Sequence, residues 1–351
     1  MRSSAARRIA FRRIGIAGVL AAGGVLLGGL LGLVATRVAH SFATPAFDLG
    51  SRAACARYSG VPGLGDEAGM AFIAGGELEI GSTRGYPEER GGSRIRIESF
   101  WIDRTEVTNA QFARFVQATG YVTSAERAGA APVFHKPTQA ELEQNGNYAW
   151  WSLVQGASWR HPEGPSGDVT QHITQRSNHP VVQVTHDDAL AYARWLGHRL
   201  PSEAQWEYAA KARRDSMALH REPRDARGKP LANFWQGDFP TVNAREDGFE
   251  TSAPVGCFPA NPFGLFDTLG NVWEWTGTSY TSSHDKDDAA HEHAASDDAA
   301  CSASAQASHR LVLKGGSFLC SSNYCARYRV AARHAQEPGQ PAMHIGFRTM
   351  R

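Results

Sequence analysis

The chain has little net charge and few cysteines. Its 36 Lys and Arg residues almost balance 35 Asp and Glu residues, leaving a formal net charge of +1. A chain with so little net charge has no overall field to attract nucleic acid or another polyanion. Only 5 cysteines occur in 351 residues, so the sequence does not describe a disulfide scaffold. No internal repeat is visible along the chain.

Glycine and tryptophan are plentiful by comparison. The sequence contains 36 glycines and 9 tryptophans, and 42% of its residues are hydrophobic. The length allows one large core or two smaller ones. Many glycines indicate many turns, and tryptophan rings can cover irregular backbone. We therefore expect a loop-rich fold rather than one built from long regular elements.

The N-terminal segment lacks acidic residues, since the first one is Asp48. Five arginines precede the 22 uncharged residues of 14–35, a stretch long enough to cross a bilayer. We interpret 1–45 as a signal-anchor or signal peptide and 46–66 as a linker, with the arginines on the cytoplasmic side. The protein is then exported and membrane-anchored with its remaining domain outside the cytoplasm. If the segment is cleaved near the Ser41–Ala43 sequence, the protein is secreted or periplasmic.

Three helix starts are predicted from capping boxes in the middle of the chain. Thr108 with Gln111, Thr185 with Asp188, and Ser202 with Gln205 each place a capping residue three positions before its partner. Apolar residues at helical spacing follow each of them. The sequence predicts short helices docked on an irregular sheet.

Residues 281–310 differ in composition from the rest of the chain. They are rich in Asp, His, Ser and Ala, and include His284, His291 and His293. Histidines and aspartates can bind zinc or copper, but such low complexity favours a flexible surface insert.

Cys320 and Cys325 stand near the C-terminus, with glycines before them and arginines after them. Two cysteines separated by four residues in an exported protein form a disulfide or serve as unrelated thiols in most cases. Two thiols that lie close together can also hold a soft ion. Because no histidine is adjacent, such a site points to cuprous copper.

Several ordered blocks of sequence carry a resemblance to a known family. The blocks run from about Met70 to the end and are FWIDRTEVTNAQF, GASWRHPEGP, HPVVQVTHDDALAYARWLGHRLPSEAQWEYAA, ANFWQGDFP, EDGF, GNVWEW and KGGSFLCSSNYCARYRVAAR. Together they resemble the formylglycine-generating enzymes, the sulfatase-modifying factors. The resemblance implies an α+β fold of the loop-rich, C-type-lectin-like kind, with a catalytic domain over 67–351. The disulfides of the animal members are not expected, because alanines such as Ala193 stand in the corresponding helices.

The resemblance also implies a reaction and its centre. Members of this family use dioxygen and copper to oxidise one cysteine of a sulfatase to Cα-formylglycine, acting on the unfolded polypeptide at a Cys-x-Pro-x-Arg-type segment. The copper-binding pair falls on Cys320 and Cys325, and the serine beside the oxygen pocket falls on Ser317. A two-coordinate ion still has positions for a substrate thiol and for oxygen. Ser321 replaces a histidine of many members, which puts a proton relay at that position in doubt.

Two calcium sites are expected. Asp267 and Glu274 flank a tight turn, and oxygen ligands of this kind favour calcium. The family's calcium positions fall in two sets, namely Asp267, Gly270, Val272 and Glu274, and Asn233, Phe234, Asp247 and Phe249. Their role would be to tie loops together where the regular core is thin.

A peptide substrate also requires a cleft. Trp150, Trp151 and Trp159 are candidates for lining it, whereas Arg327, Arg329, Arg333 and Arg348 are expected to be buried ion-pair partners. The main alternative is a non-catalytic, calcium-stabilised lectin-like binding module in which Cys320 and Cys325 form an inert disulfide. An iron-dependent oxygenase would need a helical partner domain with clustered histidines, for which the chain has no room.

Overall fold

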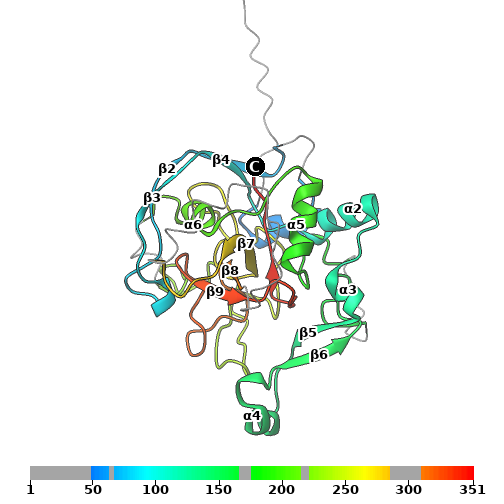
Figure 1. Ribbon diagram of the computed structural model, residues 1–351. Coiled ribbons are helices and arrows are strands. Elements are labelled where there is room, and N and C mark those ends of the chain that lie inside the picture. The colour runs from blue at the N-terminus through cyan, green and yellow to red at the C-terminus, as the bar shows by residue number, and fades with distance from the viewer. Residues whose placement is uncertain (1–48, 63–66, 166–174, 215–220, 285–309) are drawn as a thin grey trace, which may run out of the picture. The chain divides into compact units, whose positions relative to one another are not determined.

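The computed structural model describes residues 49–62, 67–165, 175–214, 221–284 and 310–351. Short helices and strands are joined by long loops (Figure 1), as the loop-rich α+β prediction required. The predicted signal-anchor over 1–45 and residues 285–309 of the predicted insert lie outside the described residues. Among the residues that the structure describes, no helix is long and apolar enough to cross a membrane.

A four-stranded sheet lies at the centre of the fold (Figure 1). Its order is β10-β7-β8-β9. The antiparallel strands are β7 (Trp273–Ser279), β8 (Leu311–Lys314) and β9 (Arg333–Gln336), and β10 (Ile345–Gly346) runs parallel to β7. Every residue of β8 is buried, which makes this strand the middle of the packed interior.

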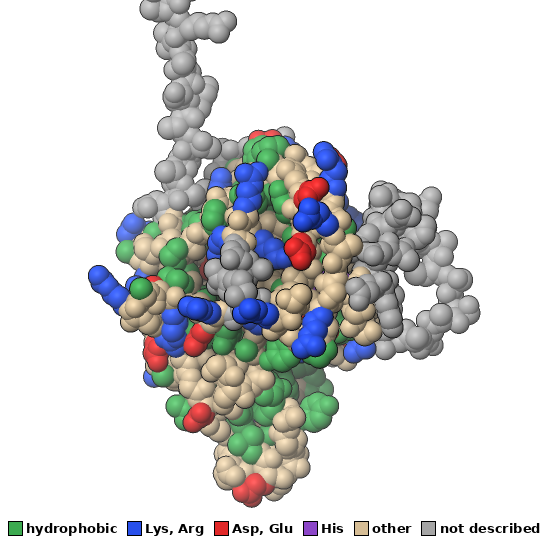
Figure 2. All heavy atoms as spheres, turned by 90° about the vertical axis from the view of Figure 1, so that its left-hand side faces the viewer, with side chains coloured by type: hydrophobic (Ala, Val, Ile, Leu, Met, Phe, Trp, Pro, Cys, Tyr) green, Lys and Arg blue, Asp and Glu red, His purple; other side chains and the backbone are tan. Residues whose placement is uncertain are grey.

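Three antiparallel two-stranded ladders surround that sheet. They pair β1 (Met70–Ile73) with β4 (Phe100–Asp103), β2 (Gly76–Glu79) with β3 (Arg94–Ile97), and β5 (Ala130–Phe134) with β6 (Trp151–Gln155). The β5–β6 ladder lies at the lower end in Figure 1, next to α4 (Gln139–Asn145) and the short η2 (Gly146–Tyr148). Figure 2 shows hydrophobic side chains gathered on this lower part, while Lys and Arg crowd the part above it.

The three predicted capping boxes each begin a helix. They open α2 (Asn109–Thr119), α5 (His186–Trp195) and α6 (Glu203–Lys211), with both reciprocal hydrogen bonds formed in every case. The structure adds α3 (Ser124–Ala128), and both α3 and α4 begin with capping boxes of their own. Helix α2 ends at Gly120, whose φ of 68° is the left-handed conformation that favours glycine.

Aromatic rings from α2 and α5 form the largest core cluster. Phe112 packs edge-on against Trp159 at 5.1 Å and is stacked on Tyr192 at 5.9 Å between ring centroids. Trp159 has no exposed surface, so the prediction that it lines a substrate cleft is wrong. It is a core residue, because its ring fills the space between helix α2 and the neighbouring loop.

The segment expected to be a linker is partly folded. Helix α1 (Arg52–Arg57) buries Ala54 and Cys55, and Cys55 forms a disulfide with Cys257. The side chain of Asn178 donates a hydrogen bond to the carbonyl of Cys55 at 2.8 Å. The linker prediction for 46–66 is therefore wrong for α1, because a long-range cross-link holds it on the body. Cys301 lies outside the described residues.

Candidate active site

The predicted reactive residues lie in one loop between β8 and β9. This loop begins after Lys314 and ends before Arg333, and these two residues face each other in the strand register. Two like charges opposite each other repel. Glu203 of α6 offsets them, because its carboxylate lies 3.4 Å from the Lys314 ammonium and 2.7 Å from the Arg333 guanidinium. Helix α6 thereby holds both ends of the reactive loop.

Glu207, one turn further along α6, strengthens this anchor. Its carboxylate lies 2.8 Å from Lys314, and both side chains are fully buried. Burial works against ionisation, but the charges of Lys314 and Lys211 prevail and lower the pKa of Glu207 to about 2. The anchor is therefore an ionised network inside the protein, where losing one partner leaves an uncompensated charge.

The turn that presents the first cysteine requires glycine. Gly316 has a φ of 78°, and a Cβ there would lie 2.6 Å from the carbonyl oxygen of Arg327. The next residue, Ser317, is fully buried, and its hydroxyl accepts a hydrogen bond from the Leu319 N–H at 3.2 Å. The Ser317 N–H lies 3.4 Å from the sulfur of Cys320. The tight turn thus brings Ser317 against the first thiol.

The two candidate thiols meet. The sulfurs of Cys320 and Cys325 are 3.6 Å apart, and both cysteines are free thiols. The alternative in which they form an inert disulfide is therefore wrong for this structure. Cys320 is buried and Cys325 is half-buried, so the pair is approached from the Cys325 side.

The two sulfurs differ in acidity. Burial, followed by the neighbouring sulfur of Cys325, raises the pKa of Cys320 well above its ordinary value. A hydrogen bond from Cys320 and the positive charge of Arg327 lower the pKa of Cys325 to about 6, against the opposing effect of burial. The pair therefore holds one thiolate, on Cys325, and one thiol that donates to it.

The four C-terminal arginines are ion-paired, as predicted. Arg329 binds Glu89, Arg333 binds Glu203, Arg348 binds Glu274, and Arg327 binds Glu88. Two of these partners, Glu88 and Glu89, belong to the short 3-10 helix η1 (Pro87–Glu89). The arginines fix the C-terminal segment, and only Arg327 also contacts a reactive sulfur.

A cleft of about 620 Å³ opens beside the two sulfurs. Its walls are largely aromatic, and Trp150 and Trp151 are among the lining residues, as predicted. Tyr324 is stacked on Phe239 with 4.6 Å between ring centroids and packs edge-on against Trp150 at 5.3 Å. The remaining lining residues include Pro132, Tyr148, Trp273, Ser317, Leu319, Cys320, Cys325, Arg327, Gln336, Gln340, Pro341 and Ala342. Rigid rings around a thiol pair suit an extended peptide.

Two histidines of the cleft were missed by the sequence reasoning. His334 and His344 both line it, and burial lowers the pKa of His334 to about 4 and that of His344 to about 3. Both rings are therefore neutral at neutral pH, and their lowered pKa values make them weak bases. No local motif marks either residue. By contrast, the hydroxyl of Ser321 is hydrogen-bonded to Asn323, so position 321 holds a structural residue.

The predicted calcium set of Asn233, Phe234, Asp247 and Phe249 is partly brought together. The carboxylate of Asp247 and the carbonyl of Phe234 converge on the side-chain amide of Gln236, which donates to both. The Phe249 N–H donates to the same carboxylate at 3.0 Å, whereas the amide nitrogen of Asn233 donates to Thr251 and Asn271. Two oxygens of this set thus point to one place, which the side-chain amide of Gln236 occupies.

The predicted calcium set of Asp267, Gly270, Val272 and Glu274 is divided by the Arg348–Glu274 ion pair. Both oxygens of Glu274 accept hydrogen bonds from Arg348, at 2.6 and 2.7 Å, and one also accepts from the Trp206 ring N–H at 2.7 Å. Asp267 has one oxygen bound to the Gly256 N–H at 2.6 Å and one without a partner among the described residues. In the described part of the chain, no group of three or more His, Cys, Asp or Glu side chains is arranged around one metal position.

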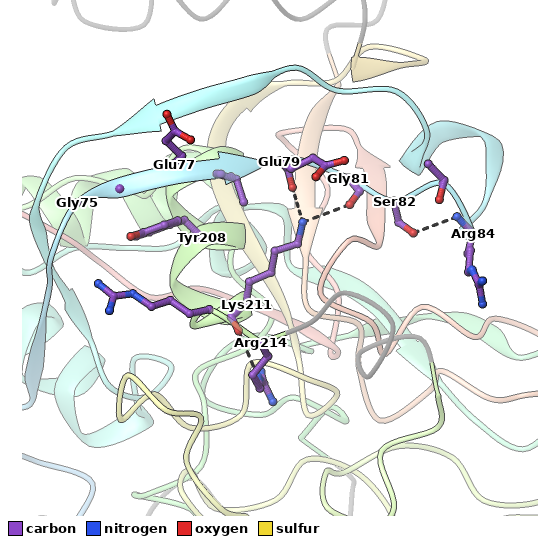
Figure 3. Close-up of a pocket in the computed structure, with 13 residues that line it drawn as sticks. Gly75, Glu77, Glu79, Gly81, Ser82, Arg84, Tyr208, Lys211 and Arg214 are labelled. Carbon is purple, nitrogen blue, oxygen red and sulfur yellow. Dashed lines mark hydrogen bonds between the residues drawn. The ribbon is translucent and has the colours of Figure 1, made fainter.

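A second pocket, of about 410 Å³, lies between β2 and α6 (Figure 3). Two of its cationic side chains, Lys211 and Arg214, are used within the fold. Lys211 donates to the carbonyls of Glu79 and Gly81 and pairs with Glu207 at 3.0 Å, and Arg214 donates to the carbonyl of Ala210 at 2.7 Å. Among the residues that the structure describes, no cysteine or histidine lines this pocket, so the thiol cleft is the better candidate for chemistry.

Comparison with known proteins places this geometry in context. Residues 62–351 match the family described as "Sulfatase-modifying factor enzyme 1-like domain". The chain is 44% identical over 294 residues to the formylglycine-generating enzyme of Mycobacterium tuberculosis, covering 80% of this chain and 96% of that relative. It is also 33% identical over 299 residues to the bovine (Bos taurus) "Inactive C-alpha-formylglycine-generating enzyme 2", covering 82% and 89%. The structure of PvdO from Pseudomonas aeruginosa shares the fold, with a TM-score of 0.53 at 21% identity, covering 84% of this chain and 99% of that one.

Proposed function

The chain belongs to the sulfatase-modifying-factor family of formylglycine-generating enzymes, and on this premise we propose that it oxidises a cysteine of a sulfatase to Cα-formylglycine with dioxygen. The observation that carries the proposal is the pair of free thiols, 3.6 Å apart, at the side of an aromatic cleft. Inactive relatives also match, so family membership alone does not establish that this chain is catalytically active. The thiol pair supports an active enzyme, because it supplies the reactive groups.

Cuprous copper fits the donor set of this pair. Two sulfurs with no carboxylate bonded to them are soft ligands, which favour copper(I) over hard cations. Cys320 and Cys325 would hold the ion. When bound, copper would supply the redox chemistry that activates dioxygen. The deprotonated Cys325 beside Arg327 is ready to act as a ligand without first losing a proton.

The residues of the cleft have three separate tasks in this proposal. The rings of Trp150 and Tyr324 hold the client segment against the sulfurs, which removes the need for a bimolecular search. Ser317 lies against Cys320 and lines the cleft, where its hydroxyl can orient oxygen or water. The rings of His334 and His344, whose pKa values burial lowers, stay neutral at neutral pH and add no positive charge to the cleft wall.

The reaction has a defined electron balance. Converting a cysteine side chain to an aldehyde releases hydrogen sulfide and gives up two electrons, whereas full reduction of dioxygen takes four. A thiol reductant, oxidised to its disulfide, supplies the other two. The products are the aldehyde, hydrogen sulfide, water and that disulfide.

The client is expected to be a sulfatase polypeptide with a Cys-x-Pro-x-Arg-type segment, still unfolded or with that segment exposed. An open cleft beside a half-buried Cys325 supports an extended substrate, since a folded protein would not reach the sulfur. The Cys55–Cys257 disulfide supports export, because structural disulfides persist in oxidising compartments. Anchoring by residues 14–35 remains part of the proposal.

Calcium is proposed as the structural cation of the fold. The convergence of the Phe234 carbonyl and the Asp247 carboxylate supports one site, and the unpartnered oxygen of buried Asp267 supports the other. Calcium would tie together loops that have little regular structure between them.

The test uses the purified protein, copper(I), a thiol reductant and a client peptide that contains one cysteine. The expected result is conversion of that cysteine to an aldehyde, detected by mass spectrometry and by capture with a hydroxylamine probe. Conversion should need copper and air, and a peptide with serine in place of cysteine serves as the control. If the wild-type protein binds the peptide without converting it under any of these conditions, the binding-module alternative is favoured.

A further inference from the structure

Strand β9 is the outermost strand of the central sheet on one side (Figure 1). All four of its residues pair with β8 along its inner edge. In the described part of the chain, no strand pairs with its outer edge. An unpaired strand edge presents N–H and C=O groups that can hydrogen-bond to another extended chain.

The backbone of this outer edge is available for pairing. Outside the ladder with β8, the main-chain groups of His334, Ala335 and Gln336 form no backbone hydrogen bond with the other described residues. His334 lies in the cleft but keeps exposed surface, and Ala335 and Gln336 are half-buried. The opposite edge of the same sheet differs, because both residues of β10 are buried. Within the described residues, β9 is therefore the edge of this sheet that a second chain can reach.

The outer edge of β9 borders the thiol cleft. The side chains of His334 and Gln336 both line this cleft, so one face of the strand is turned towards it. The loop that carries the two cysteines leads directly into β9 at Arg333. His334 interacts electrostatically with Arg327, whose guanidinium lies 3.7 Å from the Cys325 sulfur. A chain laid along β9 would therefore meet the sulfurs at the end where this strand begins.

The client segment proposed above has the pattern of a strand. In a Cys-x-Pro-x-Arg-type segment the specified residues recur at every second position. Side chains of an extended strand face the same side at this period, whereas those of a helix do so at every third or fourth position. The cysteine, proline and arginine side chains would face the cleft together, and the two variable residues would face away from it.

The proline of the client determines which backbone groups can pair with β9. Proline has no N–H, so in a paired strand its nitrogen points away from the neighbouring strand. The cysteine, two positions earlier, then points its own N–H in the same direction. The N–H groups of the two variable residues point the other way, towards β9.

We propose that the client binds as an additional strand on the outer edge of β9, with the N–H groups of its two variable residues donating to the β9 backbone. In strand addition, main-chain hydrogen bonds give the affinity and alternate side chains give the specificity. Only an extended chain can pair in this way, which explains why the client segment must be unfolded. The inference rests on the proposed function for the identity of the client, but the pairing itself requires neither copper nor turnover.

The first experiment measures the Kd of a fluorescent client peptide for the purified protein, with a thiol reductant and without added copper. Two analogues each carry an ester oxygen in place of one backbone N–H, one at the residue after the proline and one at the cysteine. Because one hydrogen bond is lost, we expect the first analogue to bind about fivefold more weakly, and the second to stay within about twofold of the unmodified peptide. Equal Kd values for the two analogues would overturn the proposal.

Amide hydrogen exchange locates the contact on the protein. The unmodified peptide should slow exchange in residues 333–336, while the β2–β3 ladder, which does not line the cleft, serves as the control and should exchange at an unchanged rate. Protection confined to the other cleft walls, or no protection at all, would show that β9 does not hold the client. Protection of β9 without aldehyde formation would retain the docking mode and refute the proposed reaction, and aldehyde formation without protection of β9 would do the reverse.

Discussion

The guanidinium of Arg327 lies 3.7 Å from the sulfur of Cys325 and also forms an ion pair with Glu88. It stacks over the ring of Tyr86 at 4.2 Å, and the hydroxyl of Tyr86 accepts a hydrogen bond from the Ala326 N–H. Glu88, which lies 239 positions earlier in the chain, thus holds the Arg327 guanidinium beside Cys325, the more acidic of the two cysteines. These contacts make Arg327 a positioning residue for Cys325.

The first prediction concerns the pH dependence of Cys325. Because the thiolate is the nucleophile and the pKa of Cys325 is lowered to about 6, alkylation of the metal-free protein should rise with pH through about 6 and level off above it. Arg327→Gln should move the midpoint upward, and Arg327→Lys should restore part of the shift. Peptide-resolved mass spectrometry after iodoacetamide treatment measures this. A wild-type midpoint near the ordinary thiol value of about 8.5 would contradict the account.

The second prediction concerns the buried charges beneath the reactive loop. Lys314→Met leaves Glu203 and Glu207 without their shared cation, and should lower the free energy of unfolding by about 3 to 5 kcal/mol. Lys229→Met, at an exposed lysine, should change it by less than about 0.5 kcal/mol. Urea denaturation provides the measurement, and equal effects from both variants would rule out the anchoring role.

The buried pair of Glu207 and Lys314 also predicts how the stability of the protein changes at low pH. The pKa of Glu207 is lower in the folded protein than its ordinary value of 4.5, so its contribution to stability is complete above that value. It is lost as the pH falls from there towards 2. Lys314→Met removes the larger of the two lysine charges that lower the pKa of Glu207, and the stability of this variant should therefore fall less than that of wild type over this interval. Parallel loss in both proteins would show that another group controls acid unfolding.

The Cys55–Cys257 disulfide should stabilise the body of the protein. Replacing both cysteines by alanine removes a cross-link between residues 202 positions apart, and should cost about 2 to 5 kcal/mol. A reductant should lower the Tm of wild type towards that of the double variant, and leave the double variant unchanged. Because Cys320 and Cys325 are already free thiols, they do not account for this response. If wild type has the same Tm with and without reductant, the Cys55–Cys257 disulfide does not stabilise the protein.

Tyr148 should contribute to client binding and not to stability. It lines the cleft with 80% of its surface exposed, so Tyr148→Ala removes an aromatic contact without opening the core. We expect KM for the client peptide to rise roughly fivefold, equivalent to about 1 kcal/mol, with Tm unchanged. Phe72→Ala, at another exposed aromatic that does not line the cleft, is the control. A similar change in KM for both would show that Tyr148 has no specific role.

Local signals predicted the parts of the fold that are made locally. The Thr108, Thr185 and Ser202 capping boxes involve hydrogen bonds across three positions, and each one begins a helix where expected. The same logic applies to α3 and α4, whose capping boxes at Thr123 and Thr138 were passed over. The cysteine pair was also predicted, because Cys320 and Cys325 lie in one loop.

Long-range contacts could not be predicted in this way. The pairing of Cys55 with Cys257 is not determined by spacing, and the approach of Glu106 to Asp267 joins separate parts of the chain. The burial of Trp159 and the position of His344 in the cleft likewise depend on how distant segments pack. The ion pair of Glu274 with Arg348 likewise joins residues that are far apart in the sequence, and the calcium role expected of Glu274 stays a prediction.

The central claim is that the sulfurs of Cys320 and Cys325 form one reaction centre. The most direct test is the yield of aldehyde from a cysteine-containing client peptide with copper-loaded wild type, Cys320→Ser and Cys325→Ser, each first shown to have the wild-type fold by circular dichroism. The account predicts conversion by wild type and loss of conversion in both variants. If either serine variant converts the peptide at the wild-type rate, the two sulfurs do not act together and the assignment is contradicted.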